Sequence, residues 1–310
     1  MVKIAPASAR LLPIRFWVWA VIGLLTIGVG LYFRFQIESH ASKLVLNTAG
    51  TALENRGGML LIAGGGNLPD RVQRQFVEMA GGPAARLVII TGVYVDDSFV
   101  TSYIDEWQSC APASVHILNA SCRADADNDS FSKPLESATG VWLGGGQQTW
   151  LTSCYRGTAT ERRIRQVLER NGVVGGTSAG AAVMSDVMIT GGRKKPSVGT
   201  GFGFLPGVII DQHFMKRNRF SRLRQVVEAN PKLVGIGIDE STAMIVSLAT
   251  RRVRVVGDSY IAVCLPEKIG RQHRVDVDFY NPGDEFQLAE PGHPEAMLAS
   301  TSMIETWLDQ

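Results

Sequence analysis

The chain has 310 residues, 45% of them hydrophobic, which is enough for one sizeable domain or two small ones with a packed core. Its 31 Lys and Arg residues nearly balance its 29 Asp and Glu residues, so the net charge of +2 gives no reason to expect a nucleic acid or a generally acidic surface as partner. Four cysteines without a C-x-x-C pair exclude a disulfide-built mini-fold and argue against a structural zinc site.

An uncharged, apolar stretch near the N-terminus runs from Phe16 to Phe33 and is rich in Val, Ile, Leu and Trp. About eighteen such residues are just long enough to cross a bilayer as a helix. The stretch is preceded by Lys3, Arg10 and Arg15 and followed by Arg34. Because the larger basic cluster lies on the N-terminal side, the positive-inside rule predicts that this end stays in the cytoplasm.

The chain is therefore expected to divide into a cytoplasmic tail (1–15), a transmembrane signal anchor (16–34), a juxtamembrane linker (35–57) and an extracytoplasmic domain (58–310). The expected location is a cell inner membrane, crossed once, with the domain in the periplasm. The alternative is secretion after signal cleavage, although no small-x-small cleavage site follows the apolar stretch. Outside the cytoplasm Cys110 and Cys122 could be oxidised together, and the sequence leaves their pairing open.

From residue 59 on, short apolar runs alternate with helical patterns. Strands are expected at 59–63, 87–91, 115–118, 141–143, 173–174, 208–210 and 234–238, and helices at 69–79, 97–108, 160–171, 181–184 and 217–227. This alternation is typical of an α/β fold with a doubly wound, mainly parallel sheet and helices on both faces. Residues 199–207 are expected to be irregular. Apolar runs at 244–248, 253–256 and 261–265 predict C-terminal β-hairpins, and a short helix is expected at 303–308.

An acidic segment at 125–136 has carboxylates at the first, third, fifth and twelfth positions of a calcium loop, namely Asp125, Asp127, Asp129 and Glu136. Ser130 occupies the position that requires glycine. A solvated acidic loop is therefore the better interpretation.

The stretch Gly176-Thr177-Ser178-Ala179-Gly180 lies between an expected strand and an expected helix. Glycines two residues before and two residues after the serine are the pattern of a nucleophile elbow, in which a sharp turn projects the hydroxyl. A tight glycine turn whose serine only caps the helix fits the same residues. The sequence thus offers Ser178 as a candidate nucleophile.

A serine hydroxyl needs a general base, and the base needs an orienting group. Of the five histidines, only His213 follows a strand at the sheet edge where Ser178 should lie, whereas His116 should be buried within a strand. Glu240 follows the next strand end. These positions predict nucleophile, base and carboxylate on one rim of a single sheet. The glycine loop 144–146 could face Ser178 and offer N–H groups to an oxyanion, or form a simple turn.

Four stretches together resemble the cyanophycinase and dipeptidase E family of serine peptidases: Gly176-Thr177-Ser178-Ala179-Gly180-Ala181, Asp211-Gln212-His213-Phe214, Gly235-Ile236-Gly237-Ile238-Asp239-Glu240 with Thr242-Ala243, and Gly145-Gly146-Gln147-Gln148. The similarity runs from about residue 59 to residue 265. It implies a fold like that of class I glutamine amidotransferases, with serine replacing cysteine.

The resemblance also implies roles for individual residues. Ser178 would be the nucleophile, His213 the base and Glu240 its partner. The oxyanion hole would be formed by N–H groups of Ala179 and of a glycine in the 144–146 loop, Gly145 or Gly146. No metal or organic cofactor is implied.

Substrate-binding residues carried over from the family pattern are Gln148, Asp211, Gln212, Arg217, Arg219 and Arg222. Guanidinium groups bind carboxylates through paired hydrogen bonds, which suits a β-aspartyl peptide with free carboxylates. Positions 217, 219 and 222 do not share one helix face, so their convergence would require an irregular start to that helix; solvated helix arginines are the alternative. Two residues depart from the family pattern: Gln147 replaces Asn or Asp, and Trp150 replaces a basic residue.

The sequence therefore predicts a membrane-anchored serine peptidase that cleaves β-aspartyl peptides of the cyanophycin type (β-Asp-Arg), or related acidic peptides, through an acyl-enzyme. Its partners would be that peptide and, through residues 16–34, the membrane; the oligomeric state is open, with a homodimer among the options. The alternatives are a non-catalytic scaffold of the same fold and an esterase, which would need Asp186 or Asp211 as its acid. Glutamine amidotransfer would need a thiol at position 178.

Overall fold

The computed structural model describes residues 57–269 and 272–297, all of which belong to one compact unit. The expected tail (1–15), anchor (16–34), nearly all of the linker (35–57) and the helix at 303–308 lie outside the described residues. Among the residues that are described, no helix combines the length and the apolar character needed to cross a membrane.

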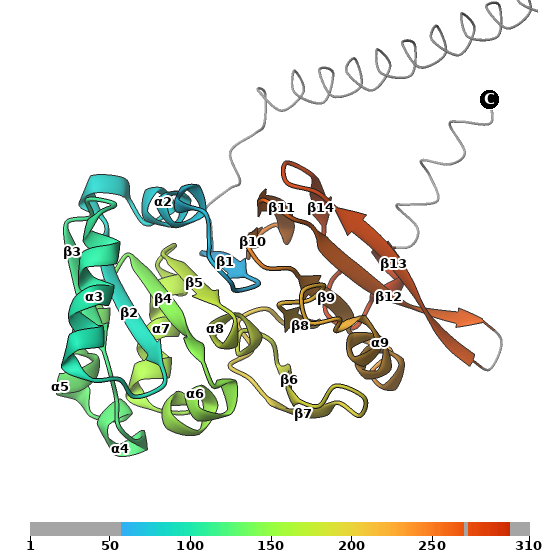
Figure 1. The fold of residues 1–310 in the computed structure, drawn as a ribbon, viewed down its shortest axis with the longest axis horizontal. Coiled ribbons are helices and arrows are strands. Elements are labelled where there is room, and N and C mark those ends of the chain that lie inside the picture. Colours follow the sequence, from blue (N-terminus) through green and yellow to red (C-terminus); the bar gives the residue numbers. More distant parts are fainter. Residues whose placement is uncertain (1–56, 270–271, 298–310) are drawn as a thin grey trace, which may run out of the picture. The chain divides into compact units, whose positions relative to one another are not determined.

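A large sheet forms the centre of the described part, with eight strands in the order β14-β11-β10-β1-β5-β4-β2-β3 (Figure 1). Five neighbouring strands are parallel: β1 (Met59–Ala63), β5 (Val173–Thr177), β4 (Gly140–Gly146), β2 (Arg86–Gly92) and β3 (Ser114–Leu118). Three antiparallel strands extend the sheet beyond β1: β10 (Thr242–Ser247), β11 (Arg252–Gly257) and β14 (Glu285–Gln287). The prediction of a mainly parallel sheet is confirmed.

Helices cover both faces of this sheet because its inner strands are apolar on both sides. One face carries α2 (Asp70–Met79) and α3 (Asp97–Gln108), and the other carries α6 (Gln148–Tyr155), α7 (Ala159–Glu169) and α8 (Ala179–Ala182). Successive side chains of β1 alternate between the two cores: Leu61 belongs to the core that includes Phe76 of α2, whereas Leu60 and Ile62 belong to the core that includes Ile164 of α7.

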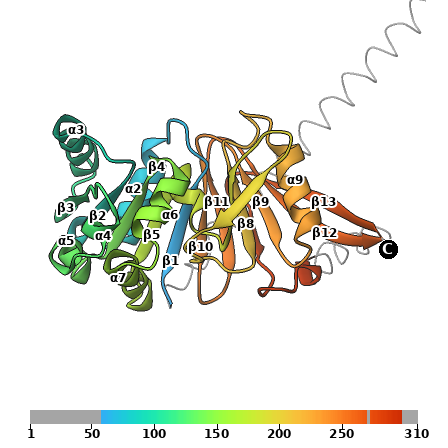
Figure 2. The same ribbon diagram turned by 90° about the horizontal axis from the view of Figure 1, so that it is seen from below.

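A second sheet has four described strands in the order β13-β12-β9-β8. The strands β8 (Val208–Gln212) and β9 (Val234–Ile238) are parallel, and β12 (Ile261–Ile269) forms a long hairpin with β13 (Gln272–Tyr280). Helix α9 (Phe220–Ala229) covers one face of this sheet (Figure 2). The prediction of one sheet for all parallel strands is therefore wrong. The edge of β1 opposite β5 is taken by β10, so β8 and β9 form their own layer.

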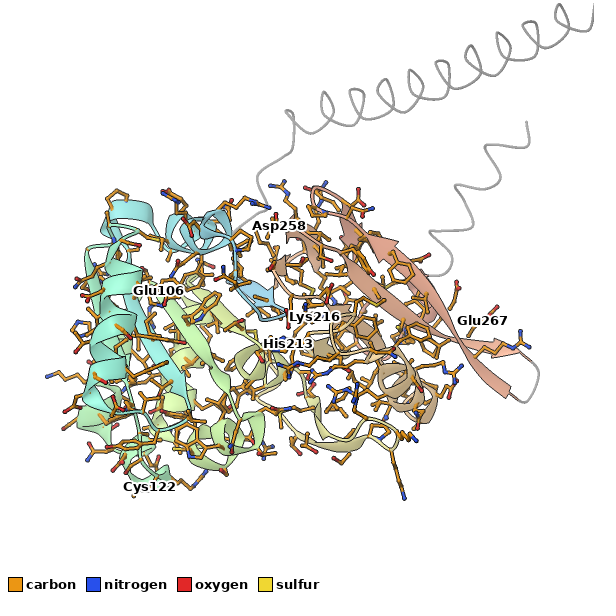
Figure 3. All side chains as sticks on the ribbon, in the orientation of Figure 1. Glu106, Cys122, His213, Lys216, Asp258 and Glu267 are labelled. Atoms are coloured by element: carbon orange, nitrogen blue, oxygen red, sulfur yellow. The ribbon has the colours of Figure 1, made fainter. Side chains whose placement is uncertain are left out.

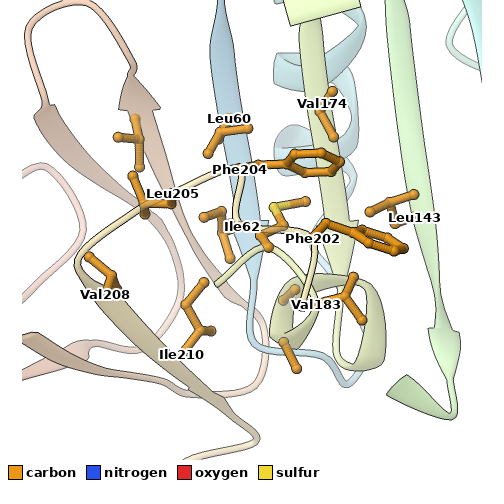
Figure 4. Close-up of a cluster of buried hydrophobic side chains, with 14 of the residues drawn as sticks. Leu60, Ile62, Leu143, Val174, Val183, Phe202, Phe204, Leu205, Val208 and Ile210 are labelled. Carbon is orange, nitrogen blue, oxygen red and sulfur yellow. The ribbon is translucent and has the colours of Figure 1, made fainter. Parts of the chain in front are cut away.

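The two sheets share one core. Leu60 and Ile62 of β1 face Val208 and Ile210 of β8, with the irregular segment 202–205 packed between them (Figure 4). Each of these side chains is almost fully buried, and burial of a large apolar side chain contributes about 1.5–3 kcal/mol. This packing fixes where the carboxyl ends of β5 and β8 lie relative to each other.

Several local elements differ from the sequence predictions. The acidic segment forms short helical turns rather than an open loop: α4 (Arg123–Ala126), α5 (Asp129–Ser132) and η2 (Lys133–Glu136). Another short turn is η1 (Gly82–Ala84).

A hairpin of β6 (Val187–Gly191) and β7 (Ser197–Thr200) was not expected, and it confines the irregular stretch to about 201–207. His116 is exposed because β3 is the edge strand of the large sheet.

Candidate active site

Three side chains from different strand ends meet where the two sheets adjoin. The Oγ atom of Ser178, after β5, lies 2.8 Å from Nε2 of His213, after β8. The Nδ1 atom of that histidine lies 2.6 Å from Oε1 of Glu240, after β9. Figure 3 shows His213 between the ribbons of the two sheets. The structure thus brings the three residues together, but across two sheets and not on one rim.

The turn that carries Ser178 is strained. Its φ of 52° and ψ of −109° lie in a region that costs a residue with a side chain about 1–3 kcal/mol. A Cβ atom on Gly176 would lie 2.7 Å from the Gly180 carbonyl oxygen, and one on Gly180 would lie 2.1 Å from that of Leu143. Only glycine fits both positions. Because Oγ of Ser178 bonds His213 rather than capping α8, the turn has the geometry of a nucleophile elbow.

The loop Gly64-Gly65-Gly66 holds the histidine and the glutamate in place. The N–H of His213, whose φ is 48°, donates to the Gly64 carbonyl oxygen at 2.7 Å. A Cβ atom on Gly65 would lie 2.5 Å from the His213 ring, and one on Gly66 would lie 2.8 Å from Cβ of Glu240. No role was predicted for this loop, although it is a glycine run that directly follows a buried strand, like the 144–146 loop.

The environment of His213 favours the neutral form of its imidazole. Burial lowers the pKa of His213 below its ordinary value of 6.5. The hydrogen bond and the negative charge of Glu240 raise that pKa, and the positive charges of Arg217 and Arg219 lower it, with a net lowering. A neutral imidazole with Nδ1–H directed at Glu240 leaves Nε2 free to accept the Ser178 proton.

Two backbone groups adjoin the serine hydroxyl. Ala179 follows Ser178 and is the first residue of α8, so its N–H has no partner within the helix. A Cβ atom on Gly145 would lie 3.7 Å from Cβ of Ser178, which places this glycine beside the nucleophile. Gly146 packs instead against Gly92, where an added Cβ would lie 2.6 Å from the carbonyl oxygen. Of the two predicted glycines, Gly145 is therefore the better placed.

The expected substrate residues separate into a buried and an exposed group. The Asp211 side chain is 0% exposed and bonds Arg222, with 2.7 Å between Oδ2 and Nε, and also Arg219, at 3.4 Å. Arg219 further donates to the backbone and side-chain oxygens of Gln212. Asp211 was expected to bind substrate. Because its carboxylate is fully buried, it can act only by positioning these arginines. Arg217 is exposed.

The arginines do not all lie on a helix. Helix α9 begins at Phe220 rather than at residue 217, and Arg217 and Arg219 lie in the turn before it. The irregular start that their convergence required is thus present. Gln148 begins α6 and donates to the carbonyl oxygen of Ile189 at 3.0 Å.

Asp239 is a further site residue that sequence analysis missed. Its Oδ1 accepts hydrogen bonds from the N–H groups of Met215 and Lys216, both at 3.1 Å, and its Oδ2 accepts one from Ser259. It therefore anchors the turn that follows His213. The sequence does offer one indication of this role, because Asp239 is a second carboxylate directly before Glu240 at the end of a predicted strand.

The esterase alternative does not fit this geometry. An esterase of that type would orient His213 with Asp186 or Asp211, but Glu240 occupies Nδ1. Asp211 is paired with arginines, and the carboxylate of Asp186 lies against Gly203. Among the described side chains, no group of His, Cys, Asp and Glu is arranged to hold a metal ion.

The two departures from the family pattern have different surroundings. Trp150 packs against the core of α6 and α7, edge-on to Tyr155 at 5.8 Å between ring centroids, whereas Gln147 is exposed. Cys110 and Cys122 are both free thiols in the structure.

Comparisons with known proteins find similarity to peptidases. The model of Peptidase family S51 matches residues 59–253. Cyanophycinase from Synechococcus elongatus is 32% identical over 252 residues, covering 77% of this chain and 78% of the relative. Cyanophycinase from Nostoc sp. is 33% identical over 221 residues, covering 68% and 74%. The crystal structure of a peptidase from an acI-B1 Actinobacterium, 21% identical, has the same fold with a TM-score of 0.58 over 75% of this chain and 98% of that chain.

Proposed function

The chain is a serine-type peptidase that belongs to peptidase family S51, and we propose that it hydrolyses β-aspartyl peptides of the cyanophycin type, such as β-Asp-Arg, or related acidic peptides. Its similarity to proteins named cyanophycinase supports this substrate class. The observation that carries the proposal is the hydrogen-bonded series Ser178, His213 and Glu240, with Arg217 exposed on the turn that follows the histidine.

In the proposed reaction, Oγ of Ser178 attacks the scissile carbonyl carbon while Nε2 of His213 takes the hydroxyl proton. Glu240 stabilises the imidazolium that forms. The N–H groups of Ala179 and Gly145 donate to the oxyanion. His213 then passes its proton to the leaving amine as the C–N bond breaks, which leaves an acyl-enzyme. Water, deprotonated by the same histidine, hydrolyses the ester and restores the serine.

Substrate recognition in this proposal depends on the arginines. The carboxylate of Asp211 balances one of the two positive charges of Arg219 and Arg222, so the buried group keeps a net charge of about +1. Arg217 adds an exposed guanidinium that can bind a carboxylate through paired hydrogen bonds. A β-aspartyl peptide presents such free carboxylates. Gln148 would add an amide contact to the peptide, whereas Gln212 is buried and bonded to Arg219 and would act by positioning that arginine.

The test compares the full chain with its Ser178→Ala variant on β-Asp-Arg and on its α-linked isomer. We expect the parent to release free arginine from the β-linked dipeptide much faster than from the α-linked one, and the variant to release none from either. Equal rates on the two isomers would contradict the β-aspartyl specificity. Undiminished hydrolysis by the variant would contradict the role of the serine.

We also propose that residues 16–34 anchor the chain in the inner membrane with the domain from residue 58 on in the periplasm. The support is the long uncharged stretch with basic residues before it. The full chain should then stay in the membrane fraction after alkaline carbonate extraction and be digested by protease added to spheroplasts. Recovery in the soluble fraction, or protection from the protease, would contradict the proposal.

A further inference from the structure

A cavity of about 160 Å³ lies on the face of the large sheet that α2 and α3 cover. Every residue that lines it belongs to β4, β5, α2, α3 or the loop after β1, so the cavity is separate from the arginine group of the second sheet. An apolar cavity of ~150 Å³ holds benzene, so this one has room for a flat group such as a guanidinium.

Two lining residues place the cavity next to the reacting groups. Thr177 directly precedes Ser178 at the end of β5. Gly66 adjoins Glu240, since a Cβ atom on Gly66 would lie 2.8 Å from Cβ of that glutamate. A Cβ atom on Gly145, the better placed oxyanion-hole glycine, would lie 3.8 Å from Cγ2 of Thr177. A substrate residue bound at the serine therefore has this cavity within reach of its side chain.

The cavity carries negative charge. Glu106 of α3 lines it and forms no ion pair with a described residue; Figure 3 marks its position. Its Oε1 accepts a hydrogen bond from Nε2 of Gln73 at 3.2 Å, which joins α3 to α2 at the cavity. In the described part of the chain, no Lys or Arg lines the cavity. In the hollow next to it Arg74 pairs with Asp70 at 3.3 Å, so that arginine does not cancel the charge of Glu106.

Aromatic rings line the cavity together with this carboxylate. The rings of Trp107 and Trp142 have centroids 5.1 Å apart, and Tyr103 lies one helical turn before Trp107. Burial raises the pKa of the Tyr103 hydroxyl, and the negative charge of Glu106 raises it further, so this charge acts inside the cavity. Aromatic faces attract cations, and a carboxylate forms strong hydrogen bonds with them. The lining therefore suits a positively charged group.

Groups of opposite charge thus approach the catalytic serine from the two sheets. The exposed Arg217 follows β8 of the second sheet, whereas Glu106 belongs to α3 on the large sheet. A substrate with a carboxylate on one side of the scissile bond and a cation on the other matches this arrangement in one direction only. The acyl part then lies toward the arginines and the leaving residue toward the cavity.

We propose that this cavity is a cation-binding subsite and that Glu106 selects substrates whose leaving residue is basic. The inference rests on the proposed function and adds to it the residue that recognises the charge of the leaving residue. Arg217 and Arg219 cannot take this part, because like charges repel. In β-Asp-Arg the group bound in the cavity is the guanidinium.

The test compares β-Asp-Arg with β-Asp-citrulline, in which a neutral ureido group of nearly the same shape replaces the guanidinium. The full chain should hydrolyse β-Asp-Arg faster. Glu106→Gln keeps the size of the side chain and removes its charge. Because an exposed ion pair is weak, this variant should lose about fivefold in kcat/KM on β-Asp-Arg and less than about twofold on β-Asp-citrulline.

The matched control is Glu169→Gln, the same change at an exposed position of α7 on the opposite face of the large sheet. It should leave both rates unchanged. The preference of the parent for arginine over citrulline should also weaken at high salt, because salt screens exposed charges. The proposal is overturned if the parent hydrolyses the two peptides equally, if Glu106→Gln keeps the parent's ratio of the two rates, or if the control changes that ratio as much.

The inference can fail independently of the proposed function. If the parent hydrolyses neither peptide, the proposed function fails, and the cavity is tested by isothermal titration of the full chain with agmatine. This probe carries a guanidinium and an amine but no carboxylate, so it offers the arginine group nothing to bind. Binding to the parent that Glu106→Gln weakens would support the subsite. Equal binding to both, or no binding to the parent, would overturn it.

Discussion

Replacing Glu240 with Gln isolates the charge that faces His213. The two side chains are joined by a 2.6 Å contact between Nδ1 and Oε1, and the histidine is almost fully buried. For charge centres about 4 Å apart at an effective dielectric constant of about 20, the imidazolium formed in the transition state loses about 4 kcal/mol. At about 1.4 kcal/mol for each factor of ten, kcat should fall roughly a thousandfold.

The assay is steady-state hydrolysis of β-Asp-Arg, with kcat and KM determined separately. KM should change by less than about threefold, because in this account Glu240 contacts the base and not the substrate. Asp258→Asn is the control: this exposed carboxylate pairs with Arg71 and should leave kcat unchanged. A fall in kcat of less than tenfold for Glu240→Gln, or a change confined to KM, would refute the reasoning.

Two further predictions concern the pH profile and the elbow. The positive charge of Arg217 lowers the pKa of His213, so Arg217→Gln should raise that pKa and move the acid limb of the kcat/KM pH profile to higher pH. The acid limb of the parent should lie below pH 6.5. An acid limb that does not move in the variant would contradict this coupling between Arg217 and His213. Gly180→Ala would place Cβ 2.1 Å from the Leu143 carbonyl oxygen and should cost about 3 kcal/mol or more of unfolding free energy in urea titration. Gly191→Ala, whose nearest contact is at 3.7 Å, should change it by less than about 1 kcal/mol, and equal effects of the two substitutions would contradict the steric argument.

Local patterns in the sequence were sufficient for the elements that depend on local interactions. The apolar run of β1 ends at a glycine, and its bounds agree with the prediction to the residue. The same holds for α3, where Asp96 accepts a hydrogen bond from the Phe99 N–H as N-cap. Ser178, His213 and Glu240 do follow predicted strand ends, but β5 lies in one sheet and β8 and β9 in the other, so the packing of the two sheets brings the three residues together.

The pairing of strands that are far apart in the sequence could not be predicted from local patterns. Either β10 or the β8–β9 pair could have joined the free edge of β1, since all are short and apolar, and the choice depends on packing between segments far apart. The β6–β7 hairpin has short strands, of which β7 is mostly exposed and polar, so no apolar alternation marked it. The role of Gly65 follows from its contact with His213 across the two sheets, and that of Asp239 from hydrogen bonds to the turn after β8; local spacing encodes neither.

The most direct test of the central claim, that Ser178 is a nucleophile activated by His213, is labelling of the full chain with a fluorophosphonate followed by peptide mapping. The account predicts a single modified residue, Ser178, with labelling slowed by β-Asp-Arg and lost in the His213→Gln variant. Label on another residue, or hydrolysis of β-Asp-Arg that continues after Ser178 is fully modified, would contradict it.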